Sequence, residues 1–203
     1  TYATDTLRSY PVLYANDGQD MKAVDLAGML DTLQRSERMA PVIVVAIHAT
    51  ERVQDYGTAG IPNAQGLGAR ADRYSQFLLT EVMTLIEARY RIASGPASTA
   101  IMGWSLGGLS AFDLAWHHPE RFGAVGVFSG AFWWRTDDRD VPAKQASRIM
   151  HRRVHETPGH PALRIWFETG LQDEAPDRDG DGVIDAVQDT GALVAELEKK
   201  GFR

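Results

Sequence analysis

The chain has 203 residues, a formal net charge of −6 and no cysteine. The absence of cysteine excludes disulfides, a thiol nucleophile and cysteine metal sites, and the absence of a basic stripe argues against a nucleic acid partner. Hydrophobic residues make up 44% and charged residues 24% of the chain, as is usual for a globular protein, and no apolar run is long enough to span a membrane. Composition indicates neither a compartment nor an oligomeric state; a secreted or periplasmic location is preferred, with a cytoplasmic one as the alternative.

Short apolar runs alternate with amphipathic segments along the whole chain. The apolar runs predict five strands, at residues 10–15, 41–47, 98–102, 124–128 and 163–168. Segments with helical spacing predict helices at residues 22–35, 71–90, 109–117, 142–155 and 189–200. This alternation predicts an α/β fold with a mostly parallel sheet and helices on both faces, in a single domain over residues 1–203.

A serine motif lies between the third predicted strand and the helix that follows it. Gly103, Ser105 and Gly107 form the pattern G-x-S-x-G after the apolar run 98–102 and before the helical run 109–117. In this context the pattern predicts a nucleophile elbow, a turn so sharp that only small residues fit beside the serine. The alternative is an ordinary helix start with Ser105 as its cap. The predicted elbow lies at the carboxyl end of its strand, which is where ligands bind in parallel sheets.

Six stretches carry a resemblance to a known family, and they occur in the expected order. They are residues 10–19, 52–57, 101–108, 118–123, 128–130 and 170–173. Together they resemble the esterase branch of the α/β-hydrolases that includes enterochelin esterases, feruloyl esterases and esterase D-like enzymes. The resemblance covers nearly the whole chain and implies the α/β-hydrolase fold and a serine, acid and histidine triad.

The resemblance assigns roles to several residues. Ser105 is the expected nucleophile, and Asp173 is the expected acid that orients a histidine, although an ordinary loop aspartate is the alternative for Asp173. The backbone N–H groups of Leu106 and Gln19 are expected to bind the oxyanion. Gly18 lets the backbone approach the substrate, or is simply a turn glycine. No cofactor is expected for catalysis.

Tryptophans flank the same edge of the predicted sheet. Trp133 and Trp134 follow the fourth strand and form either an apolar wall for an acyl or aromatic group or ordinary packing. Trp104, directly before Ser105, is grouped with the substrate-side residues.

The expected catalytic histidine has no counterpart in the chain order that the family uses. No histidine follows Asp173. Only His48 follows the carboxyl end of a predicted strand, where an ordinary rim histidine is the preferred interpretation. We therefore expect that the chain is incomplete at both ends, lacks the first and last strands of the fold, and leaves the triad histidine outside it. The histidines present are His48, His117, His118, His151, His155 and His160.

An acidic loop follows the expected triad acid. Asp177, Asp179, Asp181 and Asp185 occupy positions one, three, five and nine of a calcium-loop pattern. Gln188 stands at position twelve, where a bidentate glutamate is usual. We expect a structural Ca²⁺ there, with a solvated acidic turn as the alternative.

These observations predict a serine carboxylic-ester hydrolase that works through an acyl-enzyme. Its expected substrate is a small-molecule, polysaccharide-linked or siderophore-linked ester. The alternatives are a catalytically inactive binding protein with the same fold, or a related acyltransferase or thioesterase.

Overall fold

The computed structural model describes residues 2–173 and 175–203, and it contains one five-stranded parallel sheet. The strand order is β2-β1-β3-β4-β5, which confirms the predicted α/β fold. The strands are β1 (Val12–Ala15), β2 (Ile43–Ala46), β3 (Thr99–Trp104), β4 (Ala124–Phe128) and β5 (Arg164–Glu168). Each predicted strand is present, because short apolar runs between turns favour buried parallel strands.

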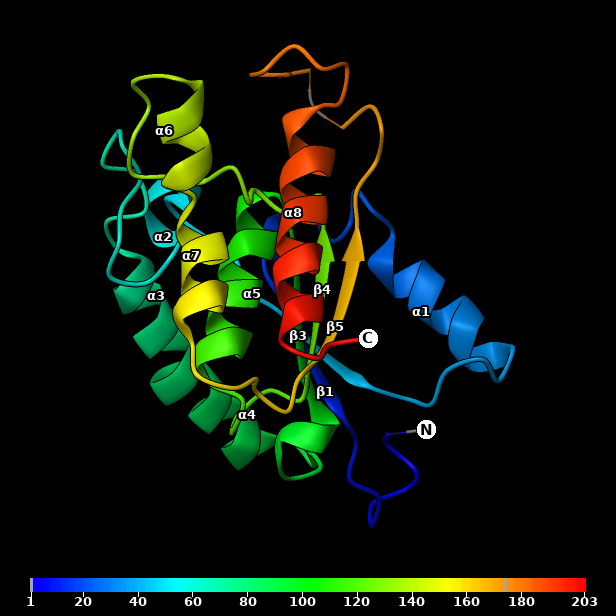
Figure 1. The fold of residues 1–203 in the computed structure, drawn as a ribbon. Coiled ribbons are helices and arrows are strands. Elements are labelled where there is room, and N and C mark those ends of the chain that lie inside the picture. The colour runs from blue at the N-terminus through cyan, green and yellow to red at the C-terminus, as the bar shows by residue number, and fades with distance from the viewer. Residues whose placement is uncertain (1, 174) are drawn as a thin grey trace.

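Helices cover the two faces of the sheet unequally. Figure 1 shows α3, α4, α5, α7 and α8 on one side and α1 on the other. The helices are α1 (Leu26–Arg35), α2 (Arg52–Asp55), α3 (Ala71–Gln76), α4 (Met83–Arg89), α5 (Leu106–His117), α6 (Val141–Ala146), α7 (Ile149–Glu156) and α8 (Asp185–Lys199). The 3₁₀ helices are η1 (Gly18–Asp20) and η3 (Pro96–Ser98), and a π-helical stretch, η2 (Phe77–Val82), joins α3 to α4. Within the described residues, no helix is both long and apolar enough to cross a membrane.

The main core lies between the sheet and the larger group of helices. Helix α5 is buried from Leu106 to Trp116, because it packs directly on the two central strands β3 and β4. Buried side chains of the strands, Tyr14, Ile101 and Val127 among them, face this helix layer. A helix that is apolar all round is expected in such a position, and α5 therefore holds its first turn rigidly against the sheet.

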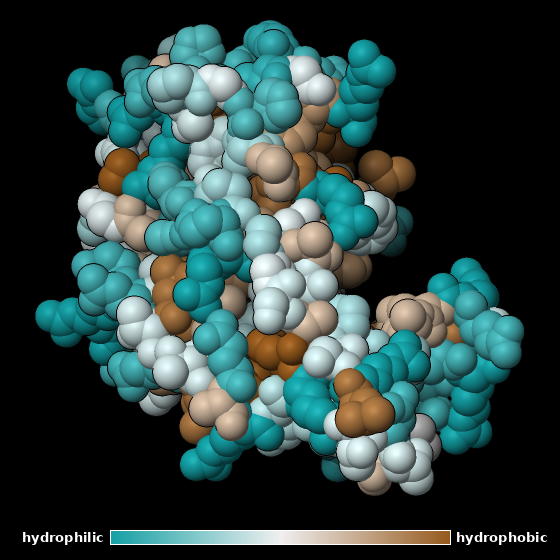
Figure 2. Space-filling view, turned by 90° about the horizontal axis from the view of Figure 1, so that it is seen from below, coloured by the Kyte–Doolittle hydropathy of each residue, from teal (hydrophilic) through white to brown (hydrophobic). Residues whose placement is uncertain are grey.

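The second face of the sheet carries a smaller apolar cluster. Leu26 of α1 packs with Ala15 and Met102, and Trp104 and Phe128 border this cluster. In the view from below, the surface is hollowed on one side, next to a protruding part of the molecule (Figure 2). This face is thus covered in part by α1.

Several predicted helices differ from the observed ones, and the largest differences concern α6, α7 and α8. The segment predicted as a helix over 142–155 is two helices, α6 and α7, because Arg148 has an extended backbone with φ −61° and ψ 118°. The last helix begins at Asp185, before the predicted residue 189. Its first turn is held by the N–H of Asp185, which donates to the carbonyl of Pro176 at 2.8 Å. At the α7 boundary the N–H of Ile149 donates to the Trp134 carbonyl at 2.9 Å. The hydrogen bonds at both boundaries thus span more positions than a helical turn, so local periodicity misses them.

Candidate active site

Ser105 occupies a strained turn between β3 and α5. Its backbone has φ 52° and ψ −119°, a region that non-glycine residues rarely adopt. Strand β4 and the segment after it hold this turn from both sides: the N–H of Ser105 donates to the Phe128 carbonyl at 2.9 Å, and the Ser105 carbonyl accepts from the Ala131 N–H at 3.1 Å. The geometry is that of the predicted elbow, with Ser105 half-buried at the carboxyl end of β3.

Close approach of the backbone makes glycine necessary on both sides of the serine. A Cβ at Gly103 would lie 2.3 Å from the carbonyl oxygen of Gly107, and a Cβ at Gly107 would lie 2.5 Å from Oδ2 of Asp17. Real Cβ atoms do not tolerate such distances from fixed groups, so larger residues would open the turn.

The loop after β1 lies beside the elbow. Strands β1 and β3 are paired, with Ala15 opposite Met102, so Gly18 and Gln19 leave the sheet next to Ser105. The amide of Asn16 donates to the Gly107 carbonyl at 2.7 Å. The N–H of Gly18 donates to the Ile47 carbonyl at 2.7 Å. These bonds tie the loop to both the elbow and the end of β2.

The two predicted oxyanion donors belong to the first turns of helices. Leu106 is the first residue of α5 and Gln19 lies in the short helix η1. The first N–H groups of a helix have no acceptor within it and point outward with the positive end of the helix dipole. The start of α5 can therefore stabilise negative charge that develops beside Ser105, whereas η1 has only three residues and contributes little dipole.

The side chain of Asp173 is held at the end of β4, next to the residue of β4 that hydrogen bonds to the Ser105 N–H. Its Oδ2 accepts from the Ser129 hydroxyl, and from the N–H of Gly170 at 2.6 Å. These two donors, the Ser129 hydroxyl first, hold the pKa of the Asp173 carboxyl below its usual range. Phe128, the last residue of β4, accepts a hydrogen bond from the Ser105 N–H. The next residue, Ser129, donates one to Asp173. Two consecutive residues therefore contact the candidate nucleophile and the candidate acid.

No histidine of the described residues hydrogen bonds to Asp173. His48 is exposed just after β2. The other histidines contact distant groups: His117 the Asp113 carbonyl, His118 the side chain of Glu120, His151 the Asp189 carbonyl, His155 the side chain of Glu196, and His160 the Pro161 carbonyl. In the described residues, Ser105 and Asp173 thus bond to the neighbouring residues Phe128 and Ser129, and no histidine hydrogen bonds to Asp173.

The tryptophans have three different environments. Trp104 stacks on Phe128 with ring centroids 4.9 Å apart, on the face of the sheet that α1 covers in part. Alternation along β3 turns the Trp104 ring toward that face, and its expected place among the substrate-side residues stays a prediction. Trp134 is buried in the main core, whereas half-buried Trp133 borders a cavity of about 430 Å³. The cavity is lined by Trp133, Arg135, Ala175, Pro176 and Asp185.

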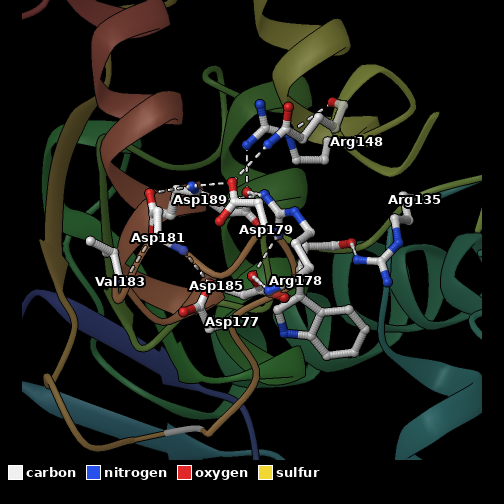
Figure 3. Close-up of polar contacts among 12 residues, drawn as sticks. Arg135, Arg148, Asp177, Arg178, Asp179, Asp181, Val183, Asp185 and Asp189 are labelled. Atoms are coloured by element: carbon white, nitrogen blue, oxygen red, sulfur yellow. Dashed lines mark hydrogen bonds and ion pairs between the residues drawn. The ribbon is translucent and has the colours of Figure 1, made fainter. Parts of the chain in front are cut away.

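The acidic loop brings three of its four predicted carboxylates together. Asp177, Asp179 and Asp181 each offer an oxygen atom, and these atoms lie within 4.8 Å of one another. Figure 3 shows them on the loop before α8. Asp177 accepts from the backbone N–H groups of Gly180 and Gly182 at 2.8 and 2.9 Å. The loop is therefore shaped around Asp177, as the glycine pattern predicts.

The fourth predicted carboxylate, Asp185, lies apart from this group. It is buried in the first turn of α8 and pairs with Nη1 of Arg178 at 3.2 Å. The side chain of Gln188 donates to Asp179 at 2.8 Å and accepts from Arg178 at 3.0 Å. Its amide therefore bridges Arg178 to the acidic group. Arg178, which sequence reasoning missed, occupies the centre of this network.

Comparisons with known proteins agree on the type of fold. A family model described as "Esterase: Putative esterase" matches residues 1–202. The iron(III) enterobactin esterase of Escherichia coli K12 is 30% identical over 145 residues, which is 71% of this chain and 33% of that protein. The uncharacterized protein YbbA of Bacillus subtilis is 24% identical over 138 residues, which is 66% of this chain and 54% of that protein. The matched region thus spans between a third and about half of the length of these curated relatives.

Solved structures show the same architecture. An enterobactin esterase from Shigella flexneri, crystallised in the presence of enterobactin, matches with a TM-score of 0.74 and 23% identity over 96% of this chain and 44% of that one. A ferulic acid esterase matches with a TM-score of 0.71 and 19% identity over 100% of this chain and 77% of that one. At these identities the likeness concerns the fold.

Proposed function

The chain belongs to the esterase family whose model matches residues 1–202, and from this membership and the site geometry we propose that it is a serine carboxylic-ester hydrolase that works through an acyl-enzyme. The observation that carries the mechanism is the contact of Ser105 and Asp173 with consecutive residues, Phe128 and Ser129, at the end of β4. Family membership supports ester chemistry, and this contact supports a serine nucleophile with a nearby acid.

In the proposed reaction, Oγ of Ser105 attacks the ester carbonyl carbon as a base removes its proton. The carbonyl oxygen becomes an oxyanion that the N–H groups of Leu106 and Gln19 bind. Loss of one such donor costs roughly 10²–10³-fold in rate in a serine hydrolase. The protonated base then gives its proton to the departing alkoxide, and an acyl-Ser105 ester remains. Water, activated by the same base, hydrolyses this ester and releases the acid.

We propose that the base is a histidine outside residues 1–203. Support comes from the partners of Asp173, which are Ser129 and Gly170 in the described part of the chain. Asp173 would hold such a histidine in the correct tautomer and stabilise its charged form. His48 is the competing candidate, because it follows β2 at the same edge of the sheet.

Two classes of ester suit this proposal. The similar solved structures are an enterobactin esterase and a ferulic acid esterase, so siderophore-type esters and aryl esters are both to be assayed as substrates. Half-buried Trp133 beside its cavity supports an acyl or aromatic group at that point.

A fluorophosphonate probe tests the mechanism on the full-length protein. We expect covalent labelling that is lost in Ser105→Ala and retained in His48→Ala. Loss of labelling in a folded His48→Ala would instead make His48 the base. A folded wild-type protein that is never labelled would favour the non-catalytic binding protein. One assay that compares an ester, a thioester and an ester with an added alcohol acceptor separates a hydrolase from a thioesterase and from an acyltransferase.

We also propose a structural calcium ion at Asp177, Asp179 and Asp181, with no catalytic role. Support comes from the three converging carboxylates, since hard cations prefer such oxygen ligands. The expected result is a melting temperature that falls with a chelator and recovers with Ca²⁺. Asp181→Asn should weaken this response. An unchanged melting temperature identifies a solvated acidic turn.

A further inference from the structure

An ion pair lies directly behind the candidate oxyanion loop. Oδ1 of Asp17 accepts from Nε of Arg52 at 2.8 Å, and the side chains are 3% and 34% exposed respectively. Nη2 of the same guanidinium donates to the carbonyl of Trp104 at 3.2 Å. Because Trp104 directly precedes Ser105, Arg52 connects the loop after β1 to the strand that carries the candidate nucleophile.

Asp17 has an unusual backbone conformation and a buried oxygen without a hydrogen-bond partner in the described part of the chain. Its backbone is left-handed, with φ 58° and ψ 47°, and its Oδ2 is buried without a hydrogen-bond partner in the described structure. That oxygen packs against the first turn of α5, where a Cβ on Gly107 would lie 2.5 Å away. Such departures persist only where surrounding contacts enforce them, and they concentrate at functional sites.

The surrounding contacts reach the candidate oxyanion donor. The N–H of Asp17 donates to the Tyr56 hydroxyl at 2.8 Å. The side-chain amide of Gln19 donates to Asp17 at 2.9 Å, and its oxygen accepts from the Ala49 N–H at 3.3 Å. Gln19 is therefore held at both ends of its side chain, which restricts the direction of its backbone N–H.

Charge gives the guanidinium a second role. A buried carboxylate close to the elbow would raise the energy of an oxyanion formed at Ser105, because like charges repel strongly in a poorly hydrated site. Arg52 is the cation that faces this carboxylate. We propose that Asp17 and Arg52 are positioning residues for the oxyanion hole: Asp17 fixes the turn that presents the Gln19 N–H, and Arg52 holds Asp17 in place and cancels its charge.

This inference rests on the proposed hydrolase function, so its test begins with a wild-type protein whose labelling depends on Ser105. Absence of that labelling contradicts the proposed hydrolase function itself. Once labelling is present, kinetics of Arg52→Met with a soluble aryl ester address the pair alone. We expect kcat to fall about 10²-fold, as for loss of an oxyanion donor, with KM nearly unchanged. Affinity for a trifluoromethyl ketone should fall by a similar factor.

The double variant separates charge cancellation from packing. In Asp17→Asn/Arg52→Met no buried charge remains, and we expect kcat to recover about tenfold relative to Arg52→Met. If the kcat losses of the two single variants simply multiply in the double variant, the proposal is overturned. Arg70→Met is the matched control, because Arg70 is 35% exposed and pairs with Glu51 at 2.9 Å; its kcat should equal that of wild type.

A conservative variant keeps the test decisive if Arg52→Met does not fold. Arg52→Lys retains the charge but not the planar fork that reaches both Asp17 and Trp104. A loss of kcat of about tenfold at constant KM supports the proposal. An unchanged kcat, or a rise in KM alone, overturns it.

Discussion

Replacement of Arg178 by methionine tests whether one buried guanidinium holds the acidic loop to the rest of the fold. The Arg178 side chain is 4% exposed, and its Nη1 donates to Oδ2 of fully buried Asp189 at 2.7 Å. Burial alone would lower the pKa of Arg178, but hydrogen bonds and charge from Asp189 and Asp185 outweigh it and raise the pKa. Methionine keeps most of the volume and removes the charge.

The expected cost follows from the carboxylates left behind. Removal of one partner of a buried ion pair destabilises a protein by about 3–5 kcal/mol. Asp189 keeps a second partner, Arg148, whereas Asp185 loses the guanidinium that pairs with it. We therefore expect Arg178→Met to lower the free energy of unfolding by about 3 kcal/mol, near the lower end of this range. For a chain of this size that corresponds to roughly 6–12 °C in melting temperature.

Urea unfolding followed by tryptophan fluorescence measures this cost, with the m-value as a check on two-state behaviour. Arg35→Met is the control, because Arg35 and Asp31 form an exposed helical pair at 2.9 Å, and we expect at most about 0.5 kcal/mol there. In Arg178→Met/Asp189→Asn the cost should be less than the sum of the single variants. A loss below about 1 kcal/mol in Arg178→Met would refute the reasoning.

Three further predictions concern single residues. Burial, aided by Arg148, lowers the pKa of His151 to about 4 from 6.5, so the folded state resists protonation. The stability advantage of wild type over His151→Gln is therefore complete above pH 6.5 and falls by about 1.4 kcal/mol per pH unit between 6.5 and 4; a pH-independent difference in urea midpoints contradicts this. Gly191→Ala in α8, where a Cβ meets no atom within 4 Å, should stabilise by about 0.5–1 kcal/mol in the same assay. Gly18→Ala places a Cβ 2.7 Å from the carbonyl carbon of Ala46 and should slow fluorophosphonate labelling at least about tenfold, whereas Gly191→Ala should label at the wild-type rate.

Short-range patterns predicted the secondary structure well. The inner strands β1, β3 and β4 coincide with apolar runs, because a strand covered on both faces needs only a few consecutive apolar residues. The edge strand β5 was also predicted, although Arg164, Trp166 and Glu168 are exposed. The turn at Ser105 was accessible in part, since Gly103 is required by a local contact with the Gly107 carbonyl, whereas Gly107 is required by distant Asp17. The Asp177 turn also follows from spacing, because its acceptor and donors lie within five positions of one another.

Hydrogen bonds and ion pairs between residues far apart in the sequence were not predicted. The break before α7 coincides with a hydrogen bond from the Ile149 N–H to the Trp134 carbonyl, and the early start of α8 with one from the Asp185 N–H to the Pro176 carbonyl. Arg178 carried no prediction from the sequence, yet its burial against Asp189 makes it the centre of a network. Trp104 was grouped with the substrate-side residues, and only the structure shows that it stacks on Phe128 at the face of the sheet that α1 covers in part.

Residue order alone determined the alternation of strands and helices, the sharp turn at Ser105 and the acidic loop, because each depends on backbone preferences within a few positions. Tertiary structure decided which side chains meet. Arg52 reaches Asp17 across 35 positions and Ser129 reaches Asp173 across 44, and such contacts arise only when parallel strands bring their carboxyl ends to one edge of the sheet.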